Sequence, residues 1–216
     1  MGAVLLVMTI GGLSAAAILL IVAFWKKIGW LKTFVLGGVT VWFVFYIMIF
    51  FIASGFSVEK TLSLNEPKEF CGFYFDCHLH AQVTDVQKTK NFGGRTANGD
   101  FYVVRIKISS DAREMPLNLL TPNFEAVDAA GTRYERDADL EKPAPDWQQK
   151  VPAGGSFEKE IVFDLPADVK TPRLDIREGY GIDHAIEAIL VGDEDSLGHK
   201  RNYFKLEQQS QVANVR

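Results

Sequence analysis

Charged side chains are missing from two long stretches near the start of the 216-residue chain. None occurs from Met1 to Trp25, and none occurs from Thr33 to Val58. A helix crossing the hydrocarbon core of a bilayer needs roughly 20 apolar residues, so each stretch is long enough to span a membrane. No basic residue precedes the first stretch, which is unlike a cleaved signal peptide. The sequence therefore predicts a hairpin of two retained transmembrane helices, at about residues 3–25 and 33–56.

Acidic residues are absent before Glu59, and the only basic residues before it are Lys26, Lys27 and Lys32. Cytoplasmic loops are enriched in lysine and arginine, so residues 26–32 are predicted to form a cytoplasmic loop. The N-terminus and the C-terminal domain would then lie on the periplasmic side of a bacterial inner membrane. Three of the 23 basic residues belong to this loop, which leaves 20 against 27 acidic residues, a formal charge of −7. This charge disfavours nucleic acid as a partner, because phosphate binding needs a basic patch.

Cysteine is scarce, and both cysteines, Cys71 and Cys77, lie in the segment FCGFYFDCHLHAQV at residues 70–83. Exported cysteines meet an oxidising compartment, so a disulfide between them is the first expectation. In one straight strand the pair would lie about 20 Å apart, at ~3.3 Å per residue, whereas a disulfide needs Cα atoms within about 7 Å. The pair can therefore bond only if the chain turns back between the cysteines. We interpret the segment as the entry strand or entry hairpin of the exported domain, with solvent-facing histidines.

The same segment raises a second hypothesis, a metal site made of Cys71, Cys77, His78 and His80. A His-x-His pair on one face of a strand can hold a metal ion. A membrane hairpin followed by an exported β-domain resembles subunit II of haem–copper oxidases, but that family has two cysteines three residues apart and ligands from a second loop. Here the spacing is Cys-x5-Cys-His-x-His, and Met115 is the only methionine after the hairpin. Copper thus stays an alternative, and solvated histidines are the simpler interpretation.

An acidic run at residues 192–200, GDEDSLGHK, could offer carboxylates to calcium. Its spacing is not that of an EF-hand loop, and an exposed acidic turn is the favoured interpretation. We expect no cofactor, with copper and calcium as the alternatives. No nucleophile elbow or catalytic triad context is present, so we expect no enzymatic activity.

The hydrophobic period of the exported part is two. Residues 100–109 and 156–165 alternate apolar and polar side chains, and residues 123–136 read as strand, turn and strand around Gly131. Short strands separated by Gly, Pro and Asp predict an all-β, antiparallel β-sandwich. The predicted organisation is a hairpin at 1–58, a linker at 59–69, the sandwich at 70–207 and a polar tail at 208–216.

A family resemblance follows from NGDFYVVRIKI, FEAVDAAGTRY and VPAGGSFEKEIVFDLP, which together cover roughly residues 80–170. These segments resemble the immunoglobulin-like extracellular domain of bacterial membrane-anchored proteins and lipoproteins, a family of generally unknown function. The matching positions are Gly99, Tyr102, Val104, Asp128, Gly131, Tyr134, Pro152, Gly154, Phe163, Asp164 and Pro166. The resemblance implies an immunoglobulin-like fold and implies no chemistry, because these are strand and turn positions. This chain departs from the lipoproteins by having a hairpin in place of a lipidated cysteine.

Small residues give both predicted helices a motif that lets helix backbones approach closely. They are Gly11, Gly12, Ala15, Gly37 and Gly38. The motifs could pack the hairpin against itself or against another membrane protein, and both alternatives stay open. Aromatic side chains surround the second helix, which suits lipid, pigment or another helix.

The function expected from these features is that of a non-enzymatic accessory or structural subunit of a larger bacterial membrane complex. In architecture alone, the chain resembles accessory subunits of photosynthetic reaction-centre and antenna complexes or of respiratory complexes. One alternative is a membrane-anchored module that binds or senses an extracytoplasmic ligand, which predicts a concave polar pocket in the sandwich. The other alternative is a copper or redox protein.

Overall fold

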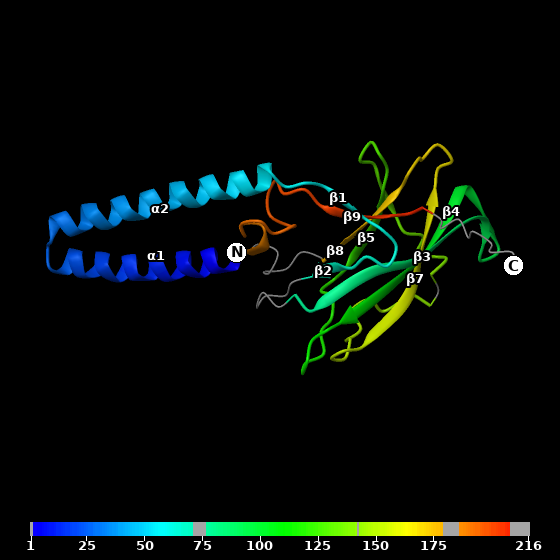
Figure 1. Cartoon of the computed structure of the whole chain (residues 1–216), viewed down its shortest axis with the longest axis horizontal. Coiled ribbons are helices and arrows are strands. Elements are labelled where there is room, and N and C mark those ends of the chain that lie inside the picture. Colours follow the sequence, from blue (N-terminus) through cyan, green and yellow to red (C-terminus); the bar gives the residue numbers. More distant parts are fainter. Residues whose placement is uncertain (1, 71–76, 142, 179–185, 208–216) are drawn as a thin grey trace, which may run out of the picture. The chain divides into compact units, whose positions relative to one another are not determined.

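The computed structural model of the chain describes residues 2–70, 77–141, 143–178 and 186–207 (Figure 1). Two compact units are present, Met1–Val58 with Ile182–Arg201, and Glu59–Gly181 with Asn202–Arg216. The first unit contains α1 (Gly2–Trp25) and α2 (Gly29–Gly55). The strands of the second unit are β1 (Lys60–Leu62), β2 (Lys68–Phe70), β3 (Leu79–Phe92), β4 (Arg95–Ser110), β5 (Asn123–Val127), β6 (Arg133–Glu135), β7 (Ser156–Leu165), β8 (Arg173–Arg177) and β9 (Asn202–Lys205).

Helices α1 and α2 are both long and apolar enough to cross a membrane. Only 6 % of the residues in the most apolar 18-residue stretch of each helix are buried. A core helix of a soluble protein would be mostly buried, so the exposed apolar surface argues against that role. Three hydroxyls bond within their own helix, among them Thr9 Oγ1, which donates to the Leu5 carbonyl at 2.8 Å, and Thr40 Oγ1, which donates to the Leu36 carbonyl at 2.9 Å. Such bonds satisfy a polar group in apolar surroundings.

The connection between the helices is shorter than the predicted loop of residues 26–32. It comprises only residues 26–28, because α2 already begins at Gly29. Lys27 takes a positive φ of 55° in the turn, and the Ile28 N–H donates to the Ala23 carbonyl at 2.9 Å. Lys32 therefore lies on α2, where its Nζ sits 4.0 Å from the centroid of the Phe24 ring. This cation–π contact gives the charge a partner on a helix that is otherwise apolar.

The described strands of the second unit form two sheets that enclose one core. The five-stranded sheet has the order β1-β9-β8-β5-β6, and the four-stranded sheet has the order β2-β3-β4-β7. Fully buried side chains of both sheets meet in a common cluster, with Val104 and Phe163 from one sheet and Phe124 and Phe204 from the other. The predicted β-sandwich is therefore confirmed, although β1 pairs with β9 in parallel rather than antiparallel orientation.

The alternation predicted for two strands is present. Tyr102, Val104, Ile106 and Ile108 of β4 are buried in the core. Strand β7 contributes Ile161, Phe163 and Leu165 to the same core. The turn between β5 and β6 also matches, since Gly131 has a φ of 85°. A φ of this sign is readily adopted by glycine, which explains the residue at this position.

Three predicted boundaries differ from the structure. Residues 59–69, expected to be a linker, contain β1 and form part of the sandwich down to the start of β2. Leu62 of β1 is buried in the core. The spacing of the apolar residues in this segment did not predict a strand. Within the predicted sandwich at 70–207, residues 186–201 group instead with the helical hairpin. The predicted tail at 208–216 lies outside the described residues.

A segment next to β6 protects the exposed edge of the four-stranded sheet. Strand β7 is the last strand of that sheet, and edge strands otherwise present unpaired backbone groups. The Val162 N–H donates to Glu141 Oε1 at 3.2 Å, and the Val162 carbonyl accepts from the Asp137 N–H at 2.7 Å. Arg136 holds the other oxygen of Glu141 at 2.5 Å. The side chain of Glu141 is 2 % exposed, and this burial raises the pKa of its carboxyl.

Replacing Glu141 with alanine is expected to lower the free energy of unfolding by about 1–3 kcal/mol, because the buried Val162 N–H loses its acceptor. Chemical denaturation followed by circular dichroism measures the change. Glu158→Ala is the matched control, since Glu158 lies exposed on β7 and should change stability by less than ~0.5 kcal/mol. Equal effects of the two substitutions would contradict the role of Glu141 at this edge.

Candidate functional site

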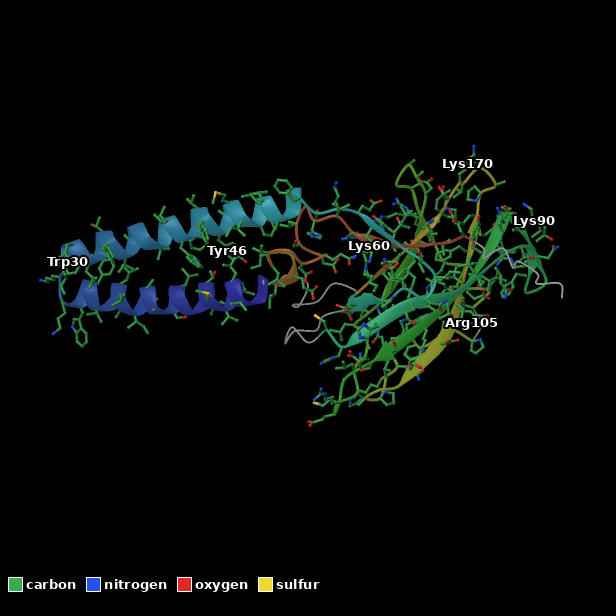
Figure 2. All side chains as sticks on the ribbon, viewed as in Figure 1. Trp30, Tyr46, Lys60, Lys90, Arg105 and Lys170 are labelled. Atoms are coloured by element: carbon green, nitrogen blue, oxygen red, sulfur yellow. The ribbon has the colours of Figure 1, made fainter. Side chains whose placement is uncertain are left out.

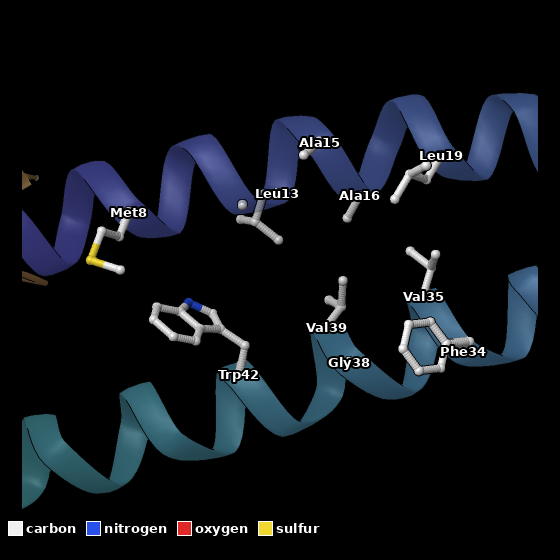
Figure 3. A pocket seen from close by; sticks show the side chains of 11 residues that line it. Met8, Leu13, Ala15, Ala16, Leu19, Phe34, Val35, Gly38, Val39 and Trp42 are labelled. Atoms are coloured by element: carbon white, nitrogen blue, oxygen red, sulfur yellow. The ribbon is translucent and has the colours of Figure 1, made fainter.

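A groove runs between α1 and α2 and contains most of the residues predicted for helix packing (Figure 3). Its volume is about 370 Å³. It is lined by Met8, Gly12, Leu13, Ala15, Ala16, Leu19, Phe34, Val35, Gly38, Val39 and Trp42. Small residues, Gly12, Ala15, Ala16 and Gly38, alternate with larger apolar side chains in this lining, so the surface is almost wholly apolar.

The glycines of the hairpin are not held in close contact between the two helices. A Cβ atom added at Gly11, Gly12, Gly37 or Gly38 would meet nothing within 4 Å. Glycines that permit close helix packing normally leave no room for such an atom, because their role is to let two backbones approach. The packing of α1 on α2 therefore does not require these glycines, and Gly12 and Gly38 instead leave the groove open.

One polar contact connects the two helices at the groove. Trp42 Nε1 donates to Thr9 Oγ1 at 3.1 Å, and the indole ring lies between the helices (Figure 3). This bond satisfies the only donor of the indole, so it fixes the ring without leaving a free polar group. The groove has no charged side chain in its lining. It suits apolar side chains or acyl chains, and it lacks the convergent polar groups that a catalytic site needs.

Phe70 and Leu79, on either side of the cysteines, lie on two different strands. Strands β2 and β3 are antiparallel, and Phe70 lies opposite Leu79. The chain thus reverses between these residues, because their strands run in opposite directions. Cys77 is disulfide-bonded. The only other cysteine of the chain, Cys71, lies outside the described residues.

The predicted metal ligands His78 and His80 converge on a residue that the sequence did not indicate. His78 Nδ1 lies 2.5 Å from Asp111 Oδ1, and His80 Nε2 lies 3.5 Å from the same oxygen. The hydrogen bond from His78 lowers the pKa of the Asp111 carboxyl. Asp111 directly follows β4, and the pairing of His80 with Ser109 brings the three side chains together. Only the register between β3 and β4 could have revealed this cluster.

The histidine cluster does not have the features of a soft-metal site. A disulfide sulfur is not a thiolate, so Cys77 in its bonded state is no copper ligand. Within the described ranges, no three His, Cys, Asp or Glu side chains are grouped so that they could hold a metal ion. His80 is also less solvent-facing than predicted, because its side chain is only 17 % exposed.

Residues of the acidic run at 192–200 are hydrogen-bonded to one another. Asp193 Oδ1 accepts the Asp195 N–H at 3.0 Å, and Ser196 Oγ donates to the Asp193 carbonyl at 2.8 Å. Burial raises the pKa of Asp193. The run is therefore a compact turn that is partly buried, whereas an exposed acidic turn was predicted.

A second groove, polar in character, lies on the five-stranded sheet and has a volume of about 480 Å³. Its lining residues are Glu59, Thr61, Ala129, Thr171, Pro172, Arg173, Lys205 and Glu207. Arg173 forms an ion pair with Glu59, and its guanidinium lies 4.4 Å from the centroid of the Tyr203 ring. Lys205 Nζ lies 3.7 Å from Glu207 Oε2. Positively and negatively charged side chains thus line the same groove.

Stability should depend on pH through Asp111. Its pKa is lowered from the ordinary value of 3.8, so the stabilisation it provides is present above that value and is lost as the pH falls through the lowered pKa. Wild type should therefore be more stable than Asp111→Asn at pH 5, and the difference should shrink towards pH 2. Urea unfolding midpoints across this range test the prediction, and a difference independent of pH would contradict it.

Comparison with protein-family models and with curated proteins finds no match. Solved structures give distant similarities. A secreted protein from Mycobacterium tuberculosis, MPT63, is 14 % identical with a TM-score of 0.45, covering 68 % of this chain and 98 % of its own. The yjhA protein from Bacillus subtilis is 13 % identical with a TM-score of 0.43, covering 67 % and 98 %. An uncharacterized β-sandwich protein from Clostridium difficile is 9 % identical with a TM-score of 0.37, covering 69 % and 97 %.

Proposed function

We propose that this protein is a non-enzymatic accessory subunit of a larger bacterial membrane complex. Its helical hairpin spans the inner membrane, and its immunoglobulin-like β-sandwich stands on the periplasmic side. The observation that carries the proposal is the open groove between α1 and α2, whose lining includes Gly12 and Gly38, two glycines that the hairpin does not need for its own packing. A transmembrane helix of a partner subunit is the proposed occupant.

The membrane-spanning role is supported by length, exposure and charge. Helix α2 has 27 residues and α1 has 24, which at 1.5 Å per residue exceeds the ~30 Å thickness of the hydrocarbon core. Large apolar side chains cover their surfaces, among them Ile21 and Phe51, which are 66 % and 68 % exposed. In water such a surface would be strongly unfavourable. The three lysines at the turn favour a cytoplasmic position for that end.

The groove fits a helix better than it fits a polar ligand. In lipid, helices associate through van der Waals packing, and small residues let the partner approach closely. The groove offers Gly12, Ala16 and Gly38 for such an approach, with the Trp42 ring as a rigid wall at one side. Aromatic side chains elsewhere on α2, such as Phe43 and Phe51, are 44 % and 68 % exposed and are proposed to contact lipid or pigment. The proposed partner complex is a photosynthetic reaction-centre or antenna complex or a respiratory complex.

Filling the groove tests the proposal. Wild-type protein purified from native membranes in mild detergent should bring down a larger complex in fixed stoichiometry. The double substitution Gly12→Leu with Gly38→Leu should lose most of the partner, because two isobutyl groups would occupy the space that its helix needs.

The matched control is Gly11→Leu with Gly37→Leu. These glycines neighbour the first pair, have the same open surroundings and do not line the groove. The control should retain the partner, and both variants should keep the circular dichroism of the sandwich. Recovery of wild type alone, as a monomer, would overturn the proposal.

The polar groove on the five-stranded sheet favours a second candidate, a module that binds an extracytoplasmic ligand. A small zwitterion could pair with Arg173 on one side and Glu207 on the other. Thermal denaturation with a panel of amino acids and other zwitterions should then show a concentration-dependent rise in melting temperature. Arg173→Gln should abolish the rise, whereas Lys170→Gln, exposed and outside the lining, should retain it. No shift with any compound would count against this function.

A further inference from the structure

Residues 186–201 form a separate element of the helical unit, here named the β8–β9 insertion (Figure 1). It is attached to α2 by two hydrogen bonds and to Ser57, just after α2, by a third. Tyr46 Oη donates to the Ile189 carbonyl at 2.7 Å, and Ser54 Oγ donates to the Leu197 carbonyl at 3.1 Å. The Lys200 N–H donates to Ser57 Oγ at 2.9 Å. These bonds extend from Tyr46 on α2 to Ser57, just beyond the end of that helix.

The beginning of α1 also touches the insertion. A Cβ atom at Gly2 would lie 2.2 Å from the Val191 carbonyl oxygen, so a larger residue could not occupy this position without a shift. The insertion therefore contacts the ends of both helices. It belongs to the side of the hairpin opposite to the lysine-bearing turn.

The depth of Tyr46 locates the insertion relative to a bilayer. Tyr46 precedes Gly55, the end of α2, by nine residues, which is about 13 Å at 1.5 Å per residue (Figure 2). Counted from Trp30 at the opposite end, Tyr46 lies about 24 Å along the helix, within a hydrocarbon core of about 30 Å. A free tyrosine hydroxyl at that depth would be costly, and the Ile189 carbonyl satisfies it.

The insertion also satisfies its own backbone. The Leu197 N–H donates to the Ala188 carbonyl at 3.0 Å, and the Leu190 N–H donates to the Glu187 carbonyl at 3.0 Å. Internal bonding of this kind is what the edge of a hydrocarbon layer requires of a non-helical segment. Leu190 is buried against its surroundings, whereas Ile189 and Leu197 remain 48 % and 66 % exposed.

We propose that the β8–β9 insertion is an interfacial element that enters the outer leaflet, with Ile189 and Leu197 in contact with lipid acyl chains. This inference rests on the proposed membrane-spanning role of the hairpin. Lipid is the occupant that the geometry favours, because the backbone carbonyls of Ile189 and Leu197 are bonded to Tyr46 and Ser54 of the apolar helix α2 while both side chains stay exposed. The segment enters the bilayer through its apolar side chains and not through attraction to charged headgroups, since Asp193, Glu194 and Asp195 would repel anionic headgroups.

A depth measurement tests the inference. Leu197→Cys in the full-length protein is labelled with a thiol-reactive fluorophore without reductant and reconstituted into phosphatidylcholine vesicles. Quenching is then compared among lipid nitroxides attached near the top of the acyl chain, which report Leu197, or near its end, which report a mid-bilayer position such as Val41, and aqueous iodide. The Leu197 probe should be quenched several-fold more by the lipid nitroxide than a probe at Met115→Cys, and several-fold less by iodide. Ile189→Cys provides an independent second position.

Two controls have matched exposure, Val41→Cys on α2 at 70 % and Met115→Cys in the sandwich unit at 71 %. Unsubstituted protein reports any labelling of the native cysteines. If lipid quenches Val41 but Leu197 behaves like Met115, the interfacial role is overturned while the spanning hairpin stands. If lipid fails to quench Val41, the proposed membrane-spanning function fails as well. Shielding of Leu197 from both quenchers would mean that protein covers it and would also overturn the inference.

Discussion

The antiparallel pairing of β3 with β4 is the interaction on which the sandwich unit depends. These two strands, of 14 and 16 residues, place Val83 opposite Ile106 and Ala81 opposite Ile108 in the core. Strand β2 joins one side of the pair and β7 joins the other, so the whole four-stranded sheet is built on it. A slip of one residue would turn each of these side chains to the opposite face, which is why burial fixes the register so firmly.

The same register creates the polar features of this sheet. It brings Asp111 beside His78 and His80, although 31 residues separate Asp111 from His80 in the sequence. On the five-stranded sheet, the pairing of β5 with β8 similarly places Glu125 and Asp175 between Arg133 and Arg177. Arg133 Nη1 lies 2.9 Å from Asp175 Oδ2, and the Asp175 side chain is fully buried. A buried carboxylate is tolerated only with such partners.

The two units differ in where their apolar side chains lie. The sandwich buries its large apolar side chains, most of them in the core between the two sheets, whereas the hairpin exposes them over most of its surface. In the hairpin, hydroxyl and indole groups bond to nearby backbone or side-chain oxygens, as Thr9 and Trp42 do. The β8–β9 insertion continues this pattern by bonding to Tyr46 and Ser54. An apolar exterior with internally satisfied polar groups is the arrangement that a bilayer demands.

Hydrophobic pattern alone determined the two long apolar helices, the period-two strands β4 and β7, and the glycine turn after β5, because these signals are local in sequence. Predictions failed where long-range pairing decides structure: β1 became part of the sandwich by pairing with β9, and residues 186–201 joined the hairpin. Whether the hairpin glycines pack the two helices could not be read from their spacing either, since it depends on the distance between backbones. Only the tertiary structure decided the partners of Glu141, Asp111 and Tyr46, because each partner lies on another element whose register or position no local pattern encodes.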